Sequence, residues 1–184
     1  HRWRSVAARL ASAGLEGPAL DVATGTGDFA YALARRPGVD RVVGVDFVPE
    51  MVALAKAKAG NRKAGPSVTF HGADALSLPF ADDAFACATS GFGLRNVVNL
   101  PVALVEMARV VRPGGRVVIL EITPFERGGA FSWLFRLYFH RLVPMLGGLL
   151  AGDREAYTYL PQSVDTFPTA AKLAGLLEQS GLRD

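Results

Sequence analysis

The chain has 184 residues, half of them hydrophobic, and carries a formal net charge of +3. That length fits one domain over residues 1–184 with a substantial buried core. The small charge and the absence of a Lys/Arg block argue against a nucleic-acid partner. The single cysteine, Cys87, excludes an internal disulfide and fits a reducing compartment such as the cytoplasm; its apolar surroundings indicate a buried, inert thiol.

Strand and helix patterns alternate along most of the chain. This alternation predicts an α/β protein, a mostly parallel sheet with helices on both faces. Strands are expected near residues 18–23, 41–46, 67–71, 84–90 and 115–121. Helices are expected near residues 2–13, 28–36, 49–60, 99–112, 130–147, 153–163 and 168–180. Pro49 suits the first turn of the third helix, and Pro113-Gly114-Gly115 is expected to end the fourth.

The pattern changes after Glu121. Residues 122–165 are rich in aromatic residues at helical spacing, and we expect them to form a helical cap inserted after the fifth strand. Charged residues, Pro144 and Gly147-Gly148 interrupt the apolar region 131–151, so it does not read as a membrane span. Sheets of this kind normally continue after the last predicted helix, so further C-terminal strands are expected beyond Asp184.

A glycine loop follows the first predicted strand. Gly25 and Gly27 lead from apolar residues into a helix, as in the nucleotide-binding corner of a Rossmann-like sheet. The spacing Gly25-x-Gly27-x-x-Ala30 also fits a relaxed dinucleotide fingerprint, so NAD is the alternative ligand. Asp21 and Asp28 flank the loop, where a pyrophosphate would meet two like charges. S-adenosylmethionine instead presents an ammonium and a sulfonium to these acids, and its carboxylate to backbone N–H groups.

Two more acids follow the next two strands. Asp46 comes about twenty residues after the glycines, the spacing at which a carboxylate accepts both ribose hydroxyls; an N-cap role is the alternative. Asp74 would accept from the adenine amino group beside the N–H of Ala75, although alone it reads as a turn residue. Carboxyl ends of parallel strands share one edge, so these residues should line one crevice. The candidate cofactor-binding residues are Asp21, Thr24, Gly25, Gly27, Asp28, Asp46, Phe47, Asp74, Ala75 and Ser90.

These motifs in this order resemble the class I S-adenosylmethionine-dependent methyltransferases. Residues 90–97, which contain Phe92-Gly93-Leu94-Arg95-Asn96, are similar to the Phe-Gly-Leu-Arg-Asn signature of the ubiquinone/menaquinone biosynthesis C-methyltransferases. Residues 109–121, 153–163 and 1–4 resemble three further segments of that family, so the likeness covers nearly the whole chain. Departures are small: Gly91 precedes the signature, and Pro161-Gln162 stands where the family more often has other residues.

The resemblance implies metal-free methylation of a ring carbon on a polyprenylated hydroquinone. Demethylmenaquinol is the leading acceptor, the benzoquinol of the ubiquinone pathway is the alternative, and methylation of another small molecule is a more remote one. Arg95 would stabilise a developing phenolate, Asn96 would orient the quinol oxygen or a water, and Tyr157 would hydrogen-bond the acceptor ring. The alternative for Tyr157 is a core or rim aromatic. The alternative for Arg95 is a structural salt bridge to Asp82, Asp83 or Glu106.

Other readings of the whole chain stay open at this stage. An NAD-dependent oxidoreductase is disfavoured by Asp28 and by the absence of a Tyr-x-x-x-Lys pair, and a non-catalytic cofactor-binding module by the Arg95-Asn96 block. Over residues 131–149 an apolar stripe lies beside Arg136, His140 and Arg141. Such a cap is a candidate for covering a polyprenyl tail and for peripheral contact with the inner face of the membrane. Packing against the sheet or in a homodimer is the alternative.

Overall fold

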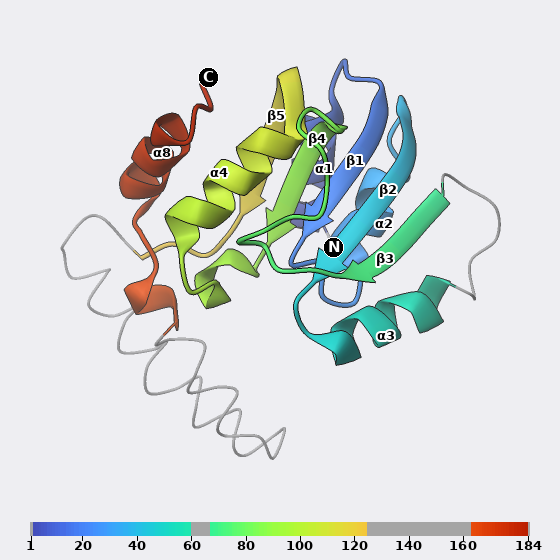
Figure 1. Cartoon of the computed structure of the whole chain (residues 1–184), viewed down its shortest axis with the longest axis horizontal. Coiled ribbons are helices and arrows are strands. Elements are labelled where there is room, and N and C mark those ends of the chain that lie inside the picture. The colour runs from blue at the N-terminus through green and yellow to red at the C-terminus, as the bar shows by residue number, and fades with distance from the viewer. Residues whose placement is uncertain (1, 60–66, 125–162, 184) are drawn as a thin grey trace. The chain divides into compact units, whose positions relative to one another are not determined.

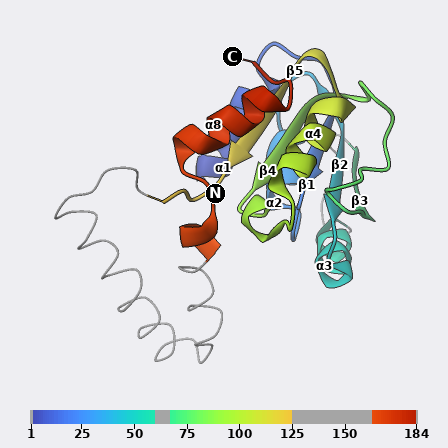
Figure 2. The same ribbon diagram turned by 60° about the vertical axis from the view of Figure 1, so that its left-hand side comes forward.

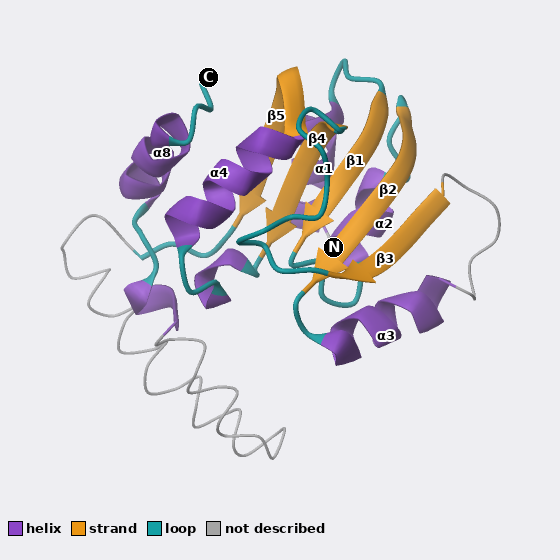
Figure 3. Cartoon of the chain, viewed as in Figure 1, coloured by secondary structure: helices purple, strands orange, loops and turns teal. Residues whose placement is uncertain are grey.

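The computed structural model describes residues 2–59, 67–124 and 163–183. Figure 3 distinguishes its helices, strands and loops. In chain order the elements are α1 (Arg2–Ser12), β1 (Gly17–Val22), α2 (Asp28–Leu33), β2 (Val39–Asp46), α3 (Pro49–Ala59), β3 (Ser67–Gly72), β4 (Phe85–Gly91), the 3-10 turn η1 (Leu94–Asn96), α4 (Leu100–Val110), β5 (Val111–Leu120) and α8 (Ala170–Gln179). The helices expected at 130–147 and 153–163 lie outside the described residues.

The chain divides into two compact units. One consists of residues 1–121 with 176–184, and the other of residues 122–175. The second unit begins at Ile122, where the sequence predicts the start of the cap. The single-domain organisation stays a prediction.

Five parallel strands form the sheet, in the order β3-β2-β1-β4-β5 (Figure 1). The chain first runs outward from β1 through β2 to β3, then returns to place β4 on the other side of β1. In such sheets ligands bind where the strand order reverses, at the carboxyl ends of the strands. The position of the site therefore follows from topology: it lies at the ends of β1 and β4, with β2 and β3 alongside.

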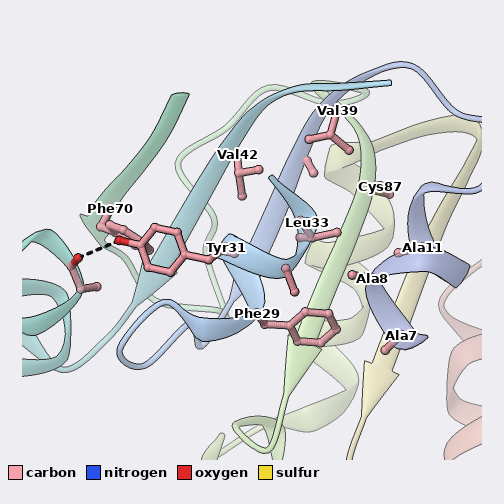
Figure 4. Packing of buried hydrophobic residues seen from close by; sticks show 14 of the residues in the cluster. Ala7, Ala8, Ala11, Phe29, Tyr31, Leu33, Val39, Val42, Phe70 and Cys87 are labelled. Atoms are coloured by element: carbon pink, nitrogen blue, oxygen red, sulfur yellow. Dashed lines mark hydrogen bonds between the residues drawn. The ribbon is translucent and has the colours of Figure 1, made fainter. Parts of the chain in front are cut away.

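Helices cover both faces of the sheet. Buried residues of α1, α2 and α3 join those of the strands in one apolar cluster, so these three helices share a face (Figure 4). All five residues from Phe29 to Leu33 on α2 are buried, and the hydroxyl of Tyr31 donates to the carbonyl of Ala55 on α3 (3.2 Å). On the opposite face α4 lies against β5, and the turned view in Figure 2 shows the helices flanking the sheet.

Two predicted boundaries are wrong. Helix α2 ends at Leu33 rather than near residue 36, because Pro37 disfavours helical backbone at the residue before it. Helix α4 ends at Val110, and β5 already begins at Val111, which pairs with Phe85. The Pro113-Gly114-Gly115 segment therefore lies inside β5, where the register shifts between Phe85 and Cys87 of β4. It is a bulge in a strand rather than the end of a helix.

A substitution at Gly115, in this bulge, tests how tightly β5 packs on β4. An added Cβ would lie 2.5 Å from the carbonyl oxygen of Ala86 and 2.5 Å from a methyl of Val111. Since backbone cannot move aside cheaply, we expect Gly115→Ala to lower the free energy of unfolding by about 1–3 kcal/mol. Gly72→Ala, whose Cβ meets nothing within 4 Å, is the matched control and should change it by less than about 0.5 kcal/mol. Urea unfolding measures both, and equal values would contradict the packing.

Candidate functional site

A cavity of about 510 Å³ opens at the carboxyl ends of β1 to β4. Its size lies within the range of roughly 300–1,000 Å³ typical of small-molecule sites. Of the predicted cofactor-binding residues it brings together Asp21, Thr24, Gly25, Asp28, Asp46, Phe47, Asp74 and Ala75. Gly27 and Ser90 are not among its lining residues, and Tyr157 lies outside the described part of the chain. Segments fifty residues apart in the sequence thus contribute to one crevice.

Backbone hydrogen bonds to β2 and within the loop hold the glycine loop in place. The N–H of Thr24 donates to the carbonyl of Val45 (2.9 Å), and the N–H of Gly27 donates to the carbonyl of Thr24 (2.9 Å). Gly27 has a φ of 81°, and an added Cβ would lie 2.6 Å from the ring of Phe70, so only glycine fits there. Gly25 differs: its Cβ would meet nothing within 4 Å, so the absence of a side chain leaves the cavity open.

Asp46 ties the end of β2 to this loop. Its carboxylate accepts from the N–H of Gly25 (2.7 Å) and from the N–H of Val48 (3.0 Å), just before α3. The bond to Val48, two residues on, is an Asx turn before α3 and not the N-cap contact that the sequence offered as an alternative; Asp46 makes it while also lining the cavity. Since each carboxylate oxygen accepts more than one hydrogen bond, these two bonds leave acceptor capacity for a ribose.

The turn after β3 forms the next part of the wall. Asp74 accepts from the N–H of Leu76 (2.9 Å), the ordinary contact of an aspartate in a turn, and Ala75 lines the cavity beside it. Phe47, at the end of β2, is 75% exposed and also lines the cavity. An exposed ring next to Asp46 provides a flat apolar surface suited to a heteroaromatic base.

Asp21 is completely buried at the end of β1. Its carboxylate accepts from the hydroxyl of Thr24 (2.6 Å) and from the hydroxyl of Thr89 on β4 (2.8 Å). Burial raises the pKa of Asp21 to about 6, against the lowering effects of the hydrogen bonds from Thr24, Thr89 and the backbone of Ala30 and of the charge on Arg4. The acid thus joins the glycine loop to β4.

Asp28 has a charged partner that the sequence analysis did not identify. The ammonium of Lys58 on α3 pairs with its carboxylate and lies 5.8 Å from the ring centroid of Tyr31. The prediction that two uncompensated acids flank the loop therefore needs correction, because Asp21 is buried with a raised pKa and Asp28 is paired with Lys58. Asp46 and Asp74 are the lining acids that the described structure leaves without a cationic partner.

Two non-glycine residues beside the cavity adopt left-handed backbone. Ala23 follows β1 with a φ of 53°, and Phe92 follows β4 with a φ of 62°. Such conformations cost of order 1–3 kcal/mol and are found at functional sites. Gly93 permits this arrangement, because a Cβ there would collide with the Cβ of Ala23. The loops at the switch point are therefore held in close contact.

Arg95 and Asn96 occupy the turn after β4. Asn96 is exposed and lines the cavity, whereas Arg95 is not among the lining residues. A guanidinium nitrogen of Arg95 lies 2.6 Å from a carboxylate oxygen of Glu121, at the end of β5, and that carboxylate is 1% exposed. The structural salt bridge that was the alternative for Arg95 is present, but its partner is Glu121, because Glu106 and Asp82 pair instead with Arg109.

Three buried polar groups on β4 and in the turn after it differ in character. The hydroxyl of Ser90 is buried and lacks a hydrogen-bond partner among the described residues, as does Nε of Arg95. Burial raises the pKa of the Cys87 thiol to about 11, so the thiolate is suppressed at neutral pH. Cys87 is therefore the inert buried thiol that the sequence predicts.

Sequence comparison identifies the family. The profile of the ubiE/COQ5 methyltransferase family matches residues 1–184. The chain is 46% identical over 181 residues to a demethylmenaquinone methyltransferase of Deinococcus radiodurans, covering 98% of this chain and 74% of that protein. It is 47% identical over 180 residues to the corresponding protein of Thermus thermophilus, covering 98% and 80%. The chain belongs to the ubiE/COQ5 methyltransferase family.

Solved structures show the same fold. The YcgJ protein of Bacillus subtilis matches with a TM-score of 0.73 at 24% identity, covering 100% of this chain and 69% of that one. Phosphoethanolamine N-methyltransferase 2 of Haemonchus contortus, solved with S-adenosyl-L-methionine, matches with a TM-score of 0.71 at 18% identity, covering 100% and 37%. The predicted Rossmann-like class I methyltransferase fold is therefore confirmed.

S-adenosylmethionine is the cofactor of this methyltransferase, as the sequence predicts, and the cavity fits it. Asp46 and Asp74 suit the hydroxyls and amino group of an adenosine, and the bare backbone at Gly25 leaves room for close approach. The family match, rather than the acids beside the loop, argues against NAD as the ligand. No group of three His, Cys, Asp or Glu side chains that could hold a metal occurs within residues 2–59, 67–124 and 163–183.

Sequence reasoning overlooked three contributors to the site. Lys58 and Glu121 give partners to predicted site residues, and Arg4 on α1 lines the cavity. Glu121 had a signal, because it stands at the carboxyl end of a strand adjacent to β4. The sequence carried no signal for Lys58 and Arg4 beyond their positions in helices, because contacts between helices that flank a sheet have no fixed sequence spacing.

Asp21 gives the fold a pH dependence with a defined sign. A carboxyl whose pKa is about 6 when folded and near 3.8 when unfolded binds its proton more tightly in the folded state. Its contribution to stability is therefore present below pH 4 and is lost as the pH rises through 6. Between pH 4 and 7 the free energy of unfolding of Asp21→Asn should gain about 2 kcal/mol relative to wild type.

Denaturant unfolding at a series of pH values measures this difference. Asn keeps one acceptor and adds a donor, so both threonine hydroxyls can still be bonded. The exposed Asp40→Asn controls for the change in net charge. Parallel stability curves for wild type and Asp21→Asn would contradict the raised pKa of Asp21.

Proposed function

We propose that this protein transfers a methyl group from S-adenosylmethionine to the ring carbon of demethylmenaquinol, a step of menaquinone biosynthesis. The names of two relatives support this acceptor, at 46–47% identity over 98% of the chain. A relative from Geobacter sulfurreducens, 43% identical over 184 residues, is named a ubiquinone/menaquinone biosynthesis C-methyltransferase. The benzoquinol of the ubiquinone pathway is accordingly the second candidate.

One observation carries the assignment of the acceptor side. Gly93 and Asn96, from the turn after β4, line the same cavity as Asp46 and Asp74. The signature that resembles quinol methyltransferases thus adjoins the residues suited to an adenosine. When bound, S-adenosylmethionine supplies an electrophilic methyl group. The chain has to orient the acceptor and assist loss of its phenolic proton, because a ring carbon is a weak nucleophile until a phenolate forms.

Asn96 and Arg95 divide this task in the proposal. Asn96 is exposed at the cavity wall, where its amide can donate to the quinol oxygen. The guanidinium of Arg95 stabilises the developing phenolate, while Glu121 fixes one edge of it. Nε of Arg95 is buried without a partner in the described part of the chain, which costs about 1–3 kcal/mol. Tyr157 remains a candidate contact to the acceptor ring.

A polyprenyl acceptor resides in the bilayer, so the protein has to reach the membrane surface in this proposal. Within the described residues no helix is long and apolar enough to cross a bilayer. The proposed peripheral contact falls on residues 131–149, which lie outside the described residues, and it stays a prediction together with the homodimer.

The acceptor is tested directly with purified protein. We expect a methylated product from S-adenosylmethionine and a short-chain demethylmenaquinol, measured by mass spectrometry, and slower turnover of the benzoquinol intermediate. A deletion strain that accumulates demethylmenaquinone should recover menaquinone with the wild-type gene. Methylation of the benzoquinol alone would move the function to the ubiquinone pathway.

Arg95 is tested by separating catalysis from stability. We expect Arg95→Gln to lower kcat roughly 10²-fold, the usual effect of losing one oxyanion donor, with little change in affinity for S-adenosylhomocysteine. Raising the pH toward about 10, the ordinary pKa of a phenol, should narrow the deficit, because the acceptor then ionises unaided. Glu121→Gln, which keeps an acceptor without its charge, should show an intermediate loss.

Arg41 is exposed on β2, where it pairs with Ser67 of β3. Arg41→Gln therefore serves as the control for the loss of one guanidinium. A lower melting temperature for Arg95→Gln with unchanged kcat would assign Arg95 a structural role only. The identity of the acceptor would still be tested separately, by the methylation assay.

A further inference from the structure

Arg4 on α1 is the basic side chain among the described residues that line the cavity. The other charged lining residues are four acids, Asp21, Asp28, Asp46 and Asp74. S-adenosylmethionine carries a carboxylate as well as an ammonium and a sulfonium, so its methionine end needs one cationic or N–H-donating partner. Within the described wall, Arg4 is the side chain whose charge complements a carboxylate.

The backbone N–H groups of the glycine loop are poorly available for that role. Those of Thr24, Gly25 and Gly27 already donate to Val45, Asp46 and Thr24 respectively. Helix α2, which follows the loop, has six residues and is too short to supply a strong helix-terminal field. The N–H of Thr26 is the loop amide left to meet a carboxylate, and a side-chain cation on the same wall would add the charge that one amide lacks.

The position of Arg4 suits the end of the cavity opposite the adenosine residues. Its guanidinium carbon lies 5.5 Å from the ring centroid of Phe92, just after β4, and its charge lowers the pKa of Asp21 at the end of β1. Asp46 and Asp74 follow β2 and β3, further along the sheet edge. Stacking on an aromatic face restrains a guanidinium and leaves its edge free for in-plane hydrogen bonds.

We propose that Arg4 binds the carboxylate of the methionine moiety of S-adenosylmethionine, through a charge-assisted and in-plane pair of hydrogen bonds. The inference rests on the cofactor assignment and orients the ligand within the cavity: methionine lies toward β4, and ribose lies toward Asp46. It also gives α1 a role in cofactor binding, because α1 packs against α2, β4 and β5 and positions Arg4 from outside the glycine loop. Phe92, in its left-handed conformation, supports the guanidinium.

Binding of three ligands without turnover tests the proposal. S-adenosylhomocysteine carries the carboxylate, its decarboxylated analogue keeps the ammonium alone, and 5′-methylthioadenosine lacks both. We expect Arg4→Gln to weaken S-adenosylhomocysteine roughly 10- to 100-fold, the usual effect of losing a hydrogen-bonded charge partner. Affinity for the other two ligands should change less than about twofold, and Arg4→Lys should recover part of the loss. Isothermal titration calorimetry gives all the affinities.

Arg9→Gln, an exposed arginine of the same helix outside the cavity wall, is the control for the change in charge. Unchanged affinity of Arg4→Gln for 5′-methylthioadenosine also certifies that the variant is folded. Equal losses of affinity for all three ligands would show that Arg4 only supports the fold. Unchanged affinity for all three would place the carboxylate elsewhere. Either result overturns the proposal. Failure of the wild type to bind S-adenosylhomocysteine would instead overturn the cofactor assignment.

Discussion

The hydrogen bonds to the buried carboxylate of Asp21 connect the parts of the site that the fold brings together. One oxygen accepts from Thr24 in the glycine loop and the other from Thr89 on β4, so a single side chain spans the switch point of the sheet. Burial makes this acid costly to ionise and raises its pKa to about 6. The two hydroxyl bonds offset part of that cost. The close contact between Ala23 and Gly93, and the left-handed backbone at Ala23 and Phe92, lie next to this bridge.

Charge at the cavity is distributed more evenly than a count of acids suggests. Lys58 balances Asp28, Glu121 balances Arg95, and Asp46 holds the N–H of Gly25 and of Val48. Each pairing also restrains a loop: α3 is joined to the glycine loop, β5 to the turn after β4, and β2 to Gly25. The ionic groups therefore fix the positions of the cavity walls as well as the electrostatic potential inside the cavity. Pairing of this kind is expected, because a buried charge without a partner is costly.

The two sides of the proposed reaction are built differently. On the donor side, backbone and short acids at four strand ends form the wall, so that side follows directly from the sheet. On the acceptor side, Asn96 and the paired Arg95 sit on a single short turn held by Glu121. Such a turn is free to vary among proteins that share the sheet, and one solved structure of the same fold, at 18% identity, is named for another acceptor, phosphoethanolamine.

The sequence by itself determined the order of strands and helices, the cofactor and the family, because parallel strands direct their carboxyl ends to one edge and Gly25, Asp46 and Asp74 stand at those ends. Arg95-Asn96 likewise carried the resemblance to quinol methyltransferases. Only the tertiary structure decided which charges meet. The partners Lys58 and Glu121, the burial of Asp21 and the place of Arg4 in the wall depend on how helices and neighbouring strands pack, and such contacts have no fixed spacing along the chain. The misplaced start of β5 has the same cause, since pairing with β4 outweighed the local turn signal of Pro113-Gly114-Gly115.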